Sequence, residues 1–379
     1  KESEPYFIYG LSKIGASNPF GMIIANSILL GACIFFLAGI IKKQYPSIIG
    51  IHILIPLLTL MSFVIIKYAA LPQSEMLFFT TSILALRCGI EIEGLWLRRL
   101  IFWFACATMS GISIWVRTVG ICLIPIVFVG FYPLLTGRSI SNIFNNLTLR
   151  SIILIGPVIA TGVFGSIYLL ISDNFYFYQF FDLSKTDASQ ISIHLLRKFT
   201  TIFQLFFNFP SRFINKVPLI LTALAGGVIW AMIITGFWSL RKKLSIVEVY
   251  IATISTLLFI WPAFQPRFWM AVIPFLFLYG IIGGQKFFSP RLCHFLIKFW
   301  IFIFCALGIT GLGYSISLSL DRDTFPSRYG NKVLTGIYRA AMDGTCPKGV
   351  NAVDFLAYQA LMRFDPSMKP AKVKCKSDL

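Results

Sequence analysis

The segment Lys67–Leu86, KYAALPQSEMLFFTTSILAL, places a short polar run directly before a long apolar one. Pro72, Gln73, Ser74 and Glu75 end one hydrophobic stretch and begin the next, as the loop between two membrane helices does. The same alternation of short polar breaks and apolar runs of about twenty residues continues along most of the chain. The pattern predicts a protein that crosses a membrane many times.

The composition points to the same class of protein. The chain has 379 residues, of which 57% are hydrophobic and only 13% are charged, whereas about a quarter of the residues in soluble domains are charged. Helices that face lipid can be apolar on every side, which accounts for the 38 phenylalanines and the scarcity of carboxylates. We therefore expect an all-α fold, a polytopic transmembrane helical bundle.

The basic residues indicate how the chain is oriented in the membrane. The net charge is +18, and the lysines and arginines gather in short clusters between apolar runs, such as IKKQYP, LWLRRL, SLRKKL and FSPRLCHFLIK. Clusters of this kind mark cytoplasmic loops. They form no basic stripe with interleaved aromatic residues, so nucleic acid is not expected as a partner. With the clusters in the cytoplasm, both ends of the given chain lie on the other side.

About ten membrane spans follow if each takes roughly twenty apolar residues. Together they form a transmembrane domain over residues 1–320. Because the chain does not begin with Met, a further crossing upstream of Lys1 also fits this topology. We expect the spans near residues 20–41, 48–66, 74–90, 99–116, 118–136, 151–172, 217–240, 246–263, 268–285 and 297–318.

Two non-cytoplasmic segments are long enough to have structure of their own. Residues 173–216 include apolar residues at helical spacing with cations between them, which predicts an amphipathic helix lying on the membrane surface. Residues 321–379 form a small helical tail, in which Cys346 and Cys375 are expected to pair in an oxidising compartment. The tail has no His and no CxxC pair, so we expect no metal site there.

The candidate site residues are polar side chains at the non-cytoplasmic boundary. Each alone could be an interfacial anchor, and Ser74 with Glu75 could simply cap a helix. Together they place cations beside a carboxylate at one depth, as binding of an anionic ligand with a lipid tail would require. The sequence contains no Walker loop, GxSxG, HExxH or Rossmann glycine pattern in a fitting context. The residues concerned are Lys67, Gln73, Glu75, Arg117, Gln265 and Arg267.

These residues also carry a resemblance to a known family. The order P-x-S-E before an aromatic-rich span, then R-x-x-G-x-x-x-x-P, then Q-P-R before another span resembles the integral-membrane glycosyltransferases of the GT-C superfamily. The opening EPYFIYGLSKIGASNPFGMIIANSILLGACIFFLAGIIKK is similar to the segment after the first outer loop of that superfamily. The likeness covers most of residues 1–285. Its matching positions are Pro72, Ser74, Glu75, Arg117, Gly120, Pro125, Gln265, Pro266 and Arg267.

The resemblance implies a function. Members of the superfamily take a sugar from a polyprenyl-phosphate carrier at the non-cytoplasmic face and give it to a glycan, lipid or protein acceptor. For this chain it implies an integral membrane enzyme, in a bacterial inner membrane with the active face toward the periplasm. Arg117 or Arg267 would stabilise the leaving phosphate, while Lys67, Gln73 and Gln265 would help to bind it. A divalent metal is compatible with this chemistry.

The catalytic carboxylate is where the chain departs from the superfamily pattern. The usual base lies in the first outer loop, of which at most KESEP is present. The base is therefore upstream of Lys1, or is Glu2, Glu4 or Glu75, or is absent. Two other functions stay open: a non-catalytic membrane subunit or lipid-binding scaffold of the same fold, and a lipid or polysaccharide transporter. An upstream carboxylate would favour the enzyme, and ion-dependent uptake would favour the transporter.

Overall fold

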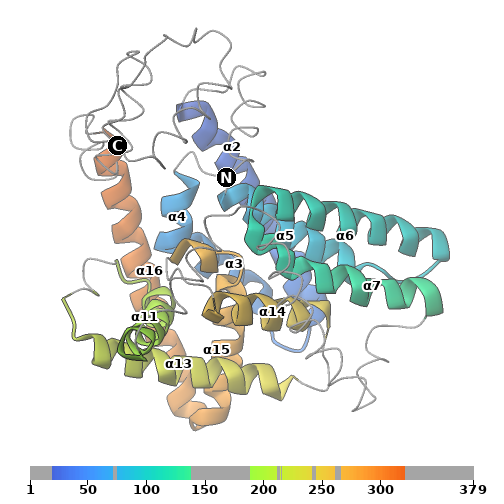
Figure 1. Cartoon of the computed structure of the whole chain (residues 1–379). Helices are drawn as coiled ribbons and strands as arrows, with labels where there is room; N and C mark the ends of the chain where they lie inside the picture. Colours follow the sequence, from blue (N-terminus) through green and yellow to red (C-terminus); the bar gives the residue numbers. More distant parts are fainter. Residues whose placement is uncertain are drawn as a thin grey trace, which may run out of the picture. The chain divides into compact units, whose positions relative to one another are not determined.

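The protein is helical throughout the part of the chain that the structure describes (Figure 1). The computed structural model describes residues 19–70, 75–137, 188–210, 214, 216–240, 245–260 and 266–320, and no strand occurs within these ranges. The predicted span 151–172 and the predicted tail with Cys346 and Cys375 lie outside the described residues. The chain divides into two compact units, Lys1–Met22 with Thr310–Leu379, and Ile23–Ile309. The following description concerns the second unit.

The helices follow one another along the chain, and two of the described ones, α7 and α15, are preceded by short 3-10 helices. Their bounds are α2 (Pro19–Gln44), α3 (Ile51–Leu60), α4 (Phe63–Ala69), α5 (Glu75–Ile90), α6 (Trp96–Val116), η1 (Thr118–Leu123), α7 (Ile124–Thr136), α11 (Ala188–Phe207), α13 (Leu219–Ser239), α14 (Ile246–Ile260), η3 (Pro266–Trp269), α15 (Ile273–Phe287) and α16 (Pro290–Leu320).

Five of the described helices are long and apolar enough to cross a membrane. These are α2, α6, α7 with most of η1, α13 and α16, and a sixth span results if the bent pair α3 and α4 is counted as one. The prediction of about ten spans is therefore not confirmed. The predicted spans at 246–263 and 268–285 correspond to α14 and α15, which have 15 residues each. At 1.5 Å per residue such a helix is about 22 Å long, less than the roughly 30 Å hydrocarbon core.

The short helices form the core of the unit. Every residue of α15 from Ile273 to Gly284 is buried, and so is most of α5. The long helices instead expose apolar side chains, such as Val228 on α13 and Phe302 on α16. This distribution is the one expected in lipid, where the outer helices face hydrocarbon and only the inner helices must be covered by protein.

Glycines allow the closest helix contact in the core. Gly236 on α13 faces Gly283 on α15, and each would place a Cβ against backbone atoms of the other helix. The Cβ of an alanine at 283 would collide with the carbonyl oxygen of Met232, and one at 236 with that of Tyr279. Small residues bring membrane helices together so that backbones touch. The α13–α15 interface therefore depends on both glycines.

A single side chain connects the break between α3 and α4 to two other helices. The two helices meet at an angle of 58°. Asn208, at the end of α11, accepts a hydrogen bond from the Phe63 N–H at 2.6 Å and donates to the carbonyl oxygens of Met61 and Phe304 at 2.8 and 3.1 Å. It is buried and has a positive φ of 60°. The amide therefore satisfies backbone groups that the bend removes from the helical pattern.

A helix does occupy the segment 173–216, namely α11, and it is amphipathic. One side packs on α13 and contacts α15. On that side Lys198 is fully buried and donates a hydrogen bond from Nζ to the Leu258 carbonyl oxygen at 2.9 Å. Burial lowers the pKa of Lys198 to about 7. The predicted placement of this helix on a membrane surface stays a prediction.

Candidate functional site

The candidate site lies where several helices begin or end. Glu75 is the first residue of α5, Arg117 separates α6 from η1, and Arg267 belongs to η3. Helix α4, which carries Lys67, contacts both α5 and η3, and α5 contacts α6 and η1. Four chain segments that are distant in sequence therefore bring charged residues to one place, which we call the Glu75 cluster (Lys67, Glu75, Arg117 and Arg267).

The Glu75 carboxylate is the centre of this cluster. Its side chain is only 2% exposed, and its Oε1 lies 2.5 Å from Nη1 of Arg117 and 3.5 Å from Nη1 of Arg267. A buried carboxylate is costly unless cations and hydrogen bonds compensate for lost hydration. The two arginines supply that compensation on one carboxylate oxygen.

The other carboxylate oxygen is not engaged by any of the described residues. Glu75 Oε2 is buried and has no hydrogen-bond partner among the described residues, and the same holds for Nε of Arg267. A buried polar atom without a partner costs about 1–3 kcal/mol. The cluster thus offers one acceptor and one donor that can bind a further polar group.

An aromatic ring holds the two arginines together. The guanidinium carbons of Arg117 and Arg267 lie 5.3 and 5.2 Å from the centroid of the Phe268 ring. Phe268 is itself buried. Cations are attracted to the face of an aromatic ring, so Phe268 offsets part of the repulsion between the two guanidinium groups. Phe268 directly follows Arg267 in the chain but was not among the residues selected from the sequence.

Lys67 and Tyr68 complete the surroundings of the cluster. Lys67 lies close enough to Arg267 for the two cations to repel each other, and its Nζ is 5.4 Å from the centroid of the Tyr68 ring. Tyr68 in turn interacts electrostatically with Arg267, Glu75 and Arg117. The cluster has three cations and one carboxylate, and therefore an excess of two positive charges when all four are ionised. An anion is the complementary ligand.

The backbone at the end of α6 fixes the position of Arg117. Arg117 is extended, with φ −147° and ψ 135°, and its carbonyl oxygen accepts a hydrogen bond from the Gly120 N–H at 2.8 Å. A Cβ at Gly120 would lie 2.6 Å from the Ser113 carbonyl oxygen. Only glycine therefore allows η1 to fold back onto α6, which gives the Arg-x-x-Gly spacing a physical reason.

The structure brings together four of the six residues selected from the sequence. Glu75, Arg117 and Arg267 are in contact, and Lys67 is adjacent to them. Gln73 and Gln265 lie outside the described residues, as does Ser74, so the capping role of Ser74 is not tested. The binding and catalytic roles assigned to these residues stay predictions.

The cluster is poorly suited to a divalent metal. Within the described ranges no group of three His, Cys, Asp or Glu side chains could hold a metal ion. With three cations and only one carboxylate, the cluster has a net positive charge that would also repel a divalent cation.

No protein-family model, curated protein or solved structure matches this chain. The interpretation of the cluster therefore rests on its geometry and on the sequence pattern.

Proposed function

We propose that the protein is an integral-membrane glycosyltransferase that moves a sugar from a polyprenyl-phosphate carrier to an acceptor at the non-cytoplasmic membrane face. The observation that carries the proposal is the Glu75 cluster, in which two guanidinium groups converge on a buried carboxylate with a free oxygen. A bacterial inner membrane with the site toward the periplasm is part of the same proposal.

The charge of the cluster suits the leaving group of this reaction. A polyprenyl-phosphate sugar is a phosphodiester with one negative charge. When the bond between the anomeric carbon and the phosphate oxygen breaks, the electron pair stays on the phosphate, which then approaches two negative charges. The two excess positive charges around Glu75 would stabilise that product-like state more than the substrate. Arg117 and Arg267 can each present a planar fork to phosphate oxygens.

Glu75 would act on the acceptor. In the proposed step an acceptor hydroxyl oxygen attacks the anomeric carbon, and the hydroxyl proton passes to the free Oε2 of Glu75. The pair with Arg117 on Oε1 would hold the carboxylate in one orientation during this transfer. The sugar–oxygen bond to the acceptor forms as the sugar–phosphate bond breaks, and the polyprenyl phosphate leaves.

The test compares charge-neutral variants of two carboxylates. Glu75→Gln keeps the size of the side chain, and we expect sugar transfer to fall about 100-fold or more, as for loss of a general base. The control is Glu93→Gln, which makes the same chemical change on an exposed carboxylate that is paired with Lys43 at 3.5 Å. It should leave transfer unchanged.

A second variant probes the phosphate contact. Arg117→Lys keeps the charge but loses the planar fork, so it should weaken donor binding more than it slows turnover of bound donor. The measurements are sugar transfer from a polyprenyl-phosphate donor by purified protein, and thermal stability of each variant. If Glu75→Gln retained full activity and only lost stability, the carboxylate would be structural and the proposal would be wrong.

A second candidate function has its own supporting observation. The short Arg117–Glu75 pair engages the carboxylate fully on one side, as a structural ion pair in a non-catalytic lipid-phosphate-binding subunit would. Such a subunit would bind polyprenyl phosphate with the same dependence on Arg117 and Arg267 but would transfer no sugar. Measuring binding and transfer on the same preparation separates the two functions.

A further inference from the structure

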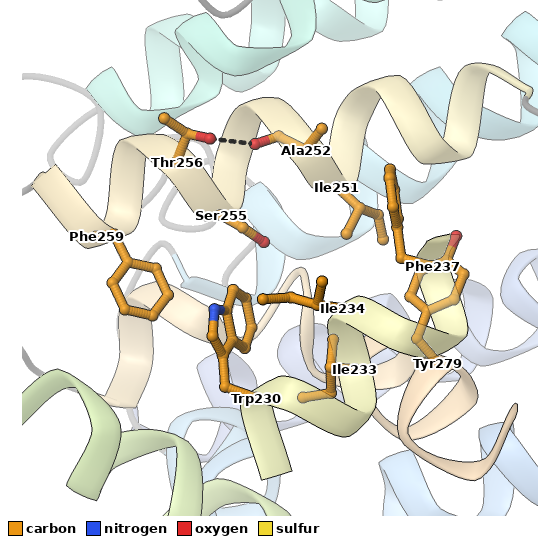
Figure 2. A pocket seen from close by; sticks show the side chains of 10 residues that line it. All are labelled: Trp230, Ile233, Ile234, Phe237, Ile251, Ala252, Ser255, Thr256, Phe259 and Tyr279. Carbon is orange, nitrogen blue, oxygen red and sulfur yellow. Dashed lines mark hydrogen bonds between the residues drawn. The ribbon is translucent and has the colours of Figure 1, made fainter. Parts of the chain in front are cut away.

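An apolar groove runs between α13 and α14 (Figure 2). Helix α13 packs chiefly on α15 and α11, whereas α14 packs chiefly on α7 and η1, so the two helices face each other across a gap. The groove has a volume of about 350 Å³, within the size range of small-molecule sites. It is lined by Trp230, Ile233, Ile234, Phe237, Ile251, Ala252, Ser255, Thr256, Phe259 and Tyr279.

The surroundings of the groove indicate a hydrocarbon occupant. Its lining contains no charged residue. Helix α13 is one of the candidate membrane spans, and it exposes Val228 and Trp238 as well as Ile234, which lines the groove. A groove that opens beside exposed apolar side chains on a membrane helix opens toward lipid. We therefore expect a lipid chain to occupy the groove.

Aromatic side chains close both ends. At one end the rings of Trp230 and Phe259 lie 4.9 Å apart, centroid to centroid, and both contact Trp269. At the other end Phe237 packs on Tyr279 at 5.6 Å, and the Tyr279 hydroxyl donates to Glu248 at 3.0 Å. The polar group of Tyr279 is therefore already engaged by the protein.

The Ser255 hydroxyl in the groove is not engaged by any described residue. Ser255 is 7% exposed, and its Oγ has no hydrogen-bond partner among the described residues. Its neighbours behave differently, because Thr253 and Thr256 each donate to the carbonyl oxygen four residues earlier at 2.8 Å. Figure 2 shows the Thr256 hydroxyl held on its own helix by Ala252, while Ser255 projects toward the side chains of α13. Among the described residues that line the groove, Ser255 is therefore a hydroxyl that can donate to an occupant.

The chemistry of this hydroxyl narrows the class of lipid. A saturated or isoprenoid chain has no hydrogen-bond acceptor, so a buried O–H would remain unsatisfied beside it. An ether-linked lipid lacks the exposed carbonyl and offers only its ether oxygens to the hydroxyl. An ester carbonyl accepts a hydrogen bond without bringing a charge into the groove.

We propose that this groove binds one acyl chain of an ester-linked membrane lipid, and that Ser255 Oγ donates a hydrogen bond to its ester carbonyl. The proposal does not depend on sugar transfer or on the Glu75 cluster. It concerns a separate lipid site on the same chain.

The experiment compares two lipids that differ only in the linkage. Purified full-length chain in detergent is titrated with diacyl phosphatidylcholine and with its dialkyl ether analogue of equal chain length, and bound lipid is counted by native mass spectrometry. We expect the diester to bind at least about tenfold more tightly, which corresponds to about 1.4 kcal/mol. Equal affinity of the wild-type protein for the two lipids would overturn the proposal, without need of any variant.

Variants locate the preference in the groove. Ser255→Ala should bring the two lipids to equal affinity, whereas Thr256→Val, which removes a hydroxyl already bonded to Ala252, should keep the preference. Ala252→Phe should fill the groove and reduce the binding of both lipids. An ester preference that survives in Ser255→Ala, or binding of both lipids that survives in Ala252→Phe, would show that the lipid binds elsewhere.

Discussion

Replacement of Asn208 tests how a broken membrane helix is held in place. Three variants separate the contributions of this residue. Asn208→Gly removes the three side-chain hydrogen bonds but tolerates the positive φ of 60°. Asn208→Ala removes the same bonds and also adds a side chain that disfavours this conformation. Asn208→Asp keeps the acceptor for the Phe63 N–H but places a carboxylate oxygen against the carbonyl oxygens of Met61 and Phe304.

The expected losses of stability follow from these contacts. At about 0.6–1 kcal/mol for each of three hydrogen bonds, Asn208→Gly should lower the free energy of unfolding by about 2–3 kcal/mol. The left-handed backbone adds about 1 kcal/mol for Asn208→Ala, which gives about 3–4 kcal/mol. Asn208→Asp should lose more than Asn208→Gly, because it replaces attraction to two carbonyl oxygens with repulsion.

The assay is reversible chemical unfolding in mixed detergent micelles, followed by tryptophan fluorescence and circular dichroism. The wild type should be the most stable, followed by Asn208→Gly and then Asn208→Ala. Asn208→Asp should also be less stable than Asn208→Gly. If the glycine variant lost less than about 1 kcal/mol, or if aspartate equalled the wild type, the amide would not be what holds the α3–α4 break.

Two further predictions concern the core. Gly236→Ala should lower the free energy of unfolding by about 1–3 kcal/mol or more, because its Cβ would meet the backbone of α15. Gly227→Ala on the same helix meets nothing, so it should be neutral or slightly stabilising. Equal effects of the two variants would show that α13 and α15 are not in backbone contact. Burial lowers the pKa of Lys198 from 10.5 to about 7. Between pH 7 and pH 10.5 the amine is therefore mostly protonated in the unfolded chain and mostly neutral in the folded chain. The free energy of unfolding should therefore rise from about pH 7 toward pH 10.5. Lys198→Met should remove this rise. An identical pH profile for the wild type and the variant would contradict the burial of a neutral amine.

The sequence predicts the long helices well and the breaks poorly. The apolar runs that form α2, α6, α13 and α16 are local features that a count of hydrophobic residues detects. The bend between α3 and α4 is not local, because it depends on Asn208 from a distant part of the chain. Hydrophobicity also cannot separate α15, which is buried in protein, from a helix that faces lipid, since both are apolar on all sides.

Part of the candidate site could be predicted from the sequence. Glu75, Arg117 and Arg267 stand out because charged residues are rare in this chain and these three fall on the same predicted side of the membrane. Phe268 gives no such signal among 38 phenylalanines. Ser255 was also missed, because a serine in an apolar helix usually bonds to its own backbone and only the structure shows that this one does not.

The shortness of α14 and α15 has a consequence for how the protein is made. A helix of 15 residues is a weak signal for insertion when it leaves the ribosome alone, because it cannot bridge the bilayer. Both helices lie in sequence between α13 and α16, which are long enough to be recognised by the insertion machinery. Helix α13 emerges first, and its glycine face is the surface on which α15 packs. We therefore expect α14 and α15 to insert only together with their longer neighbours, with the glycine face of α13 already in place to receive α15.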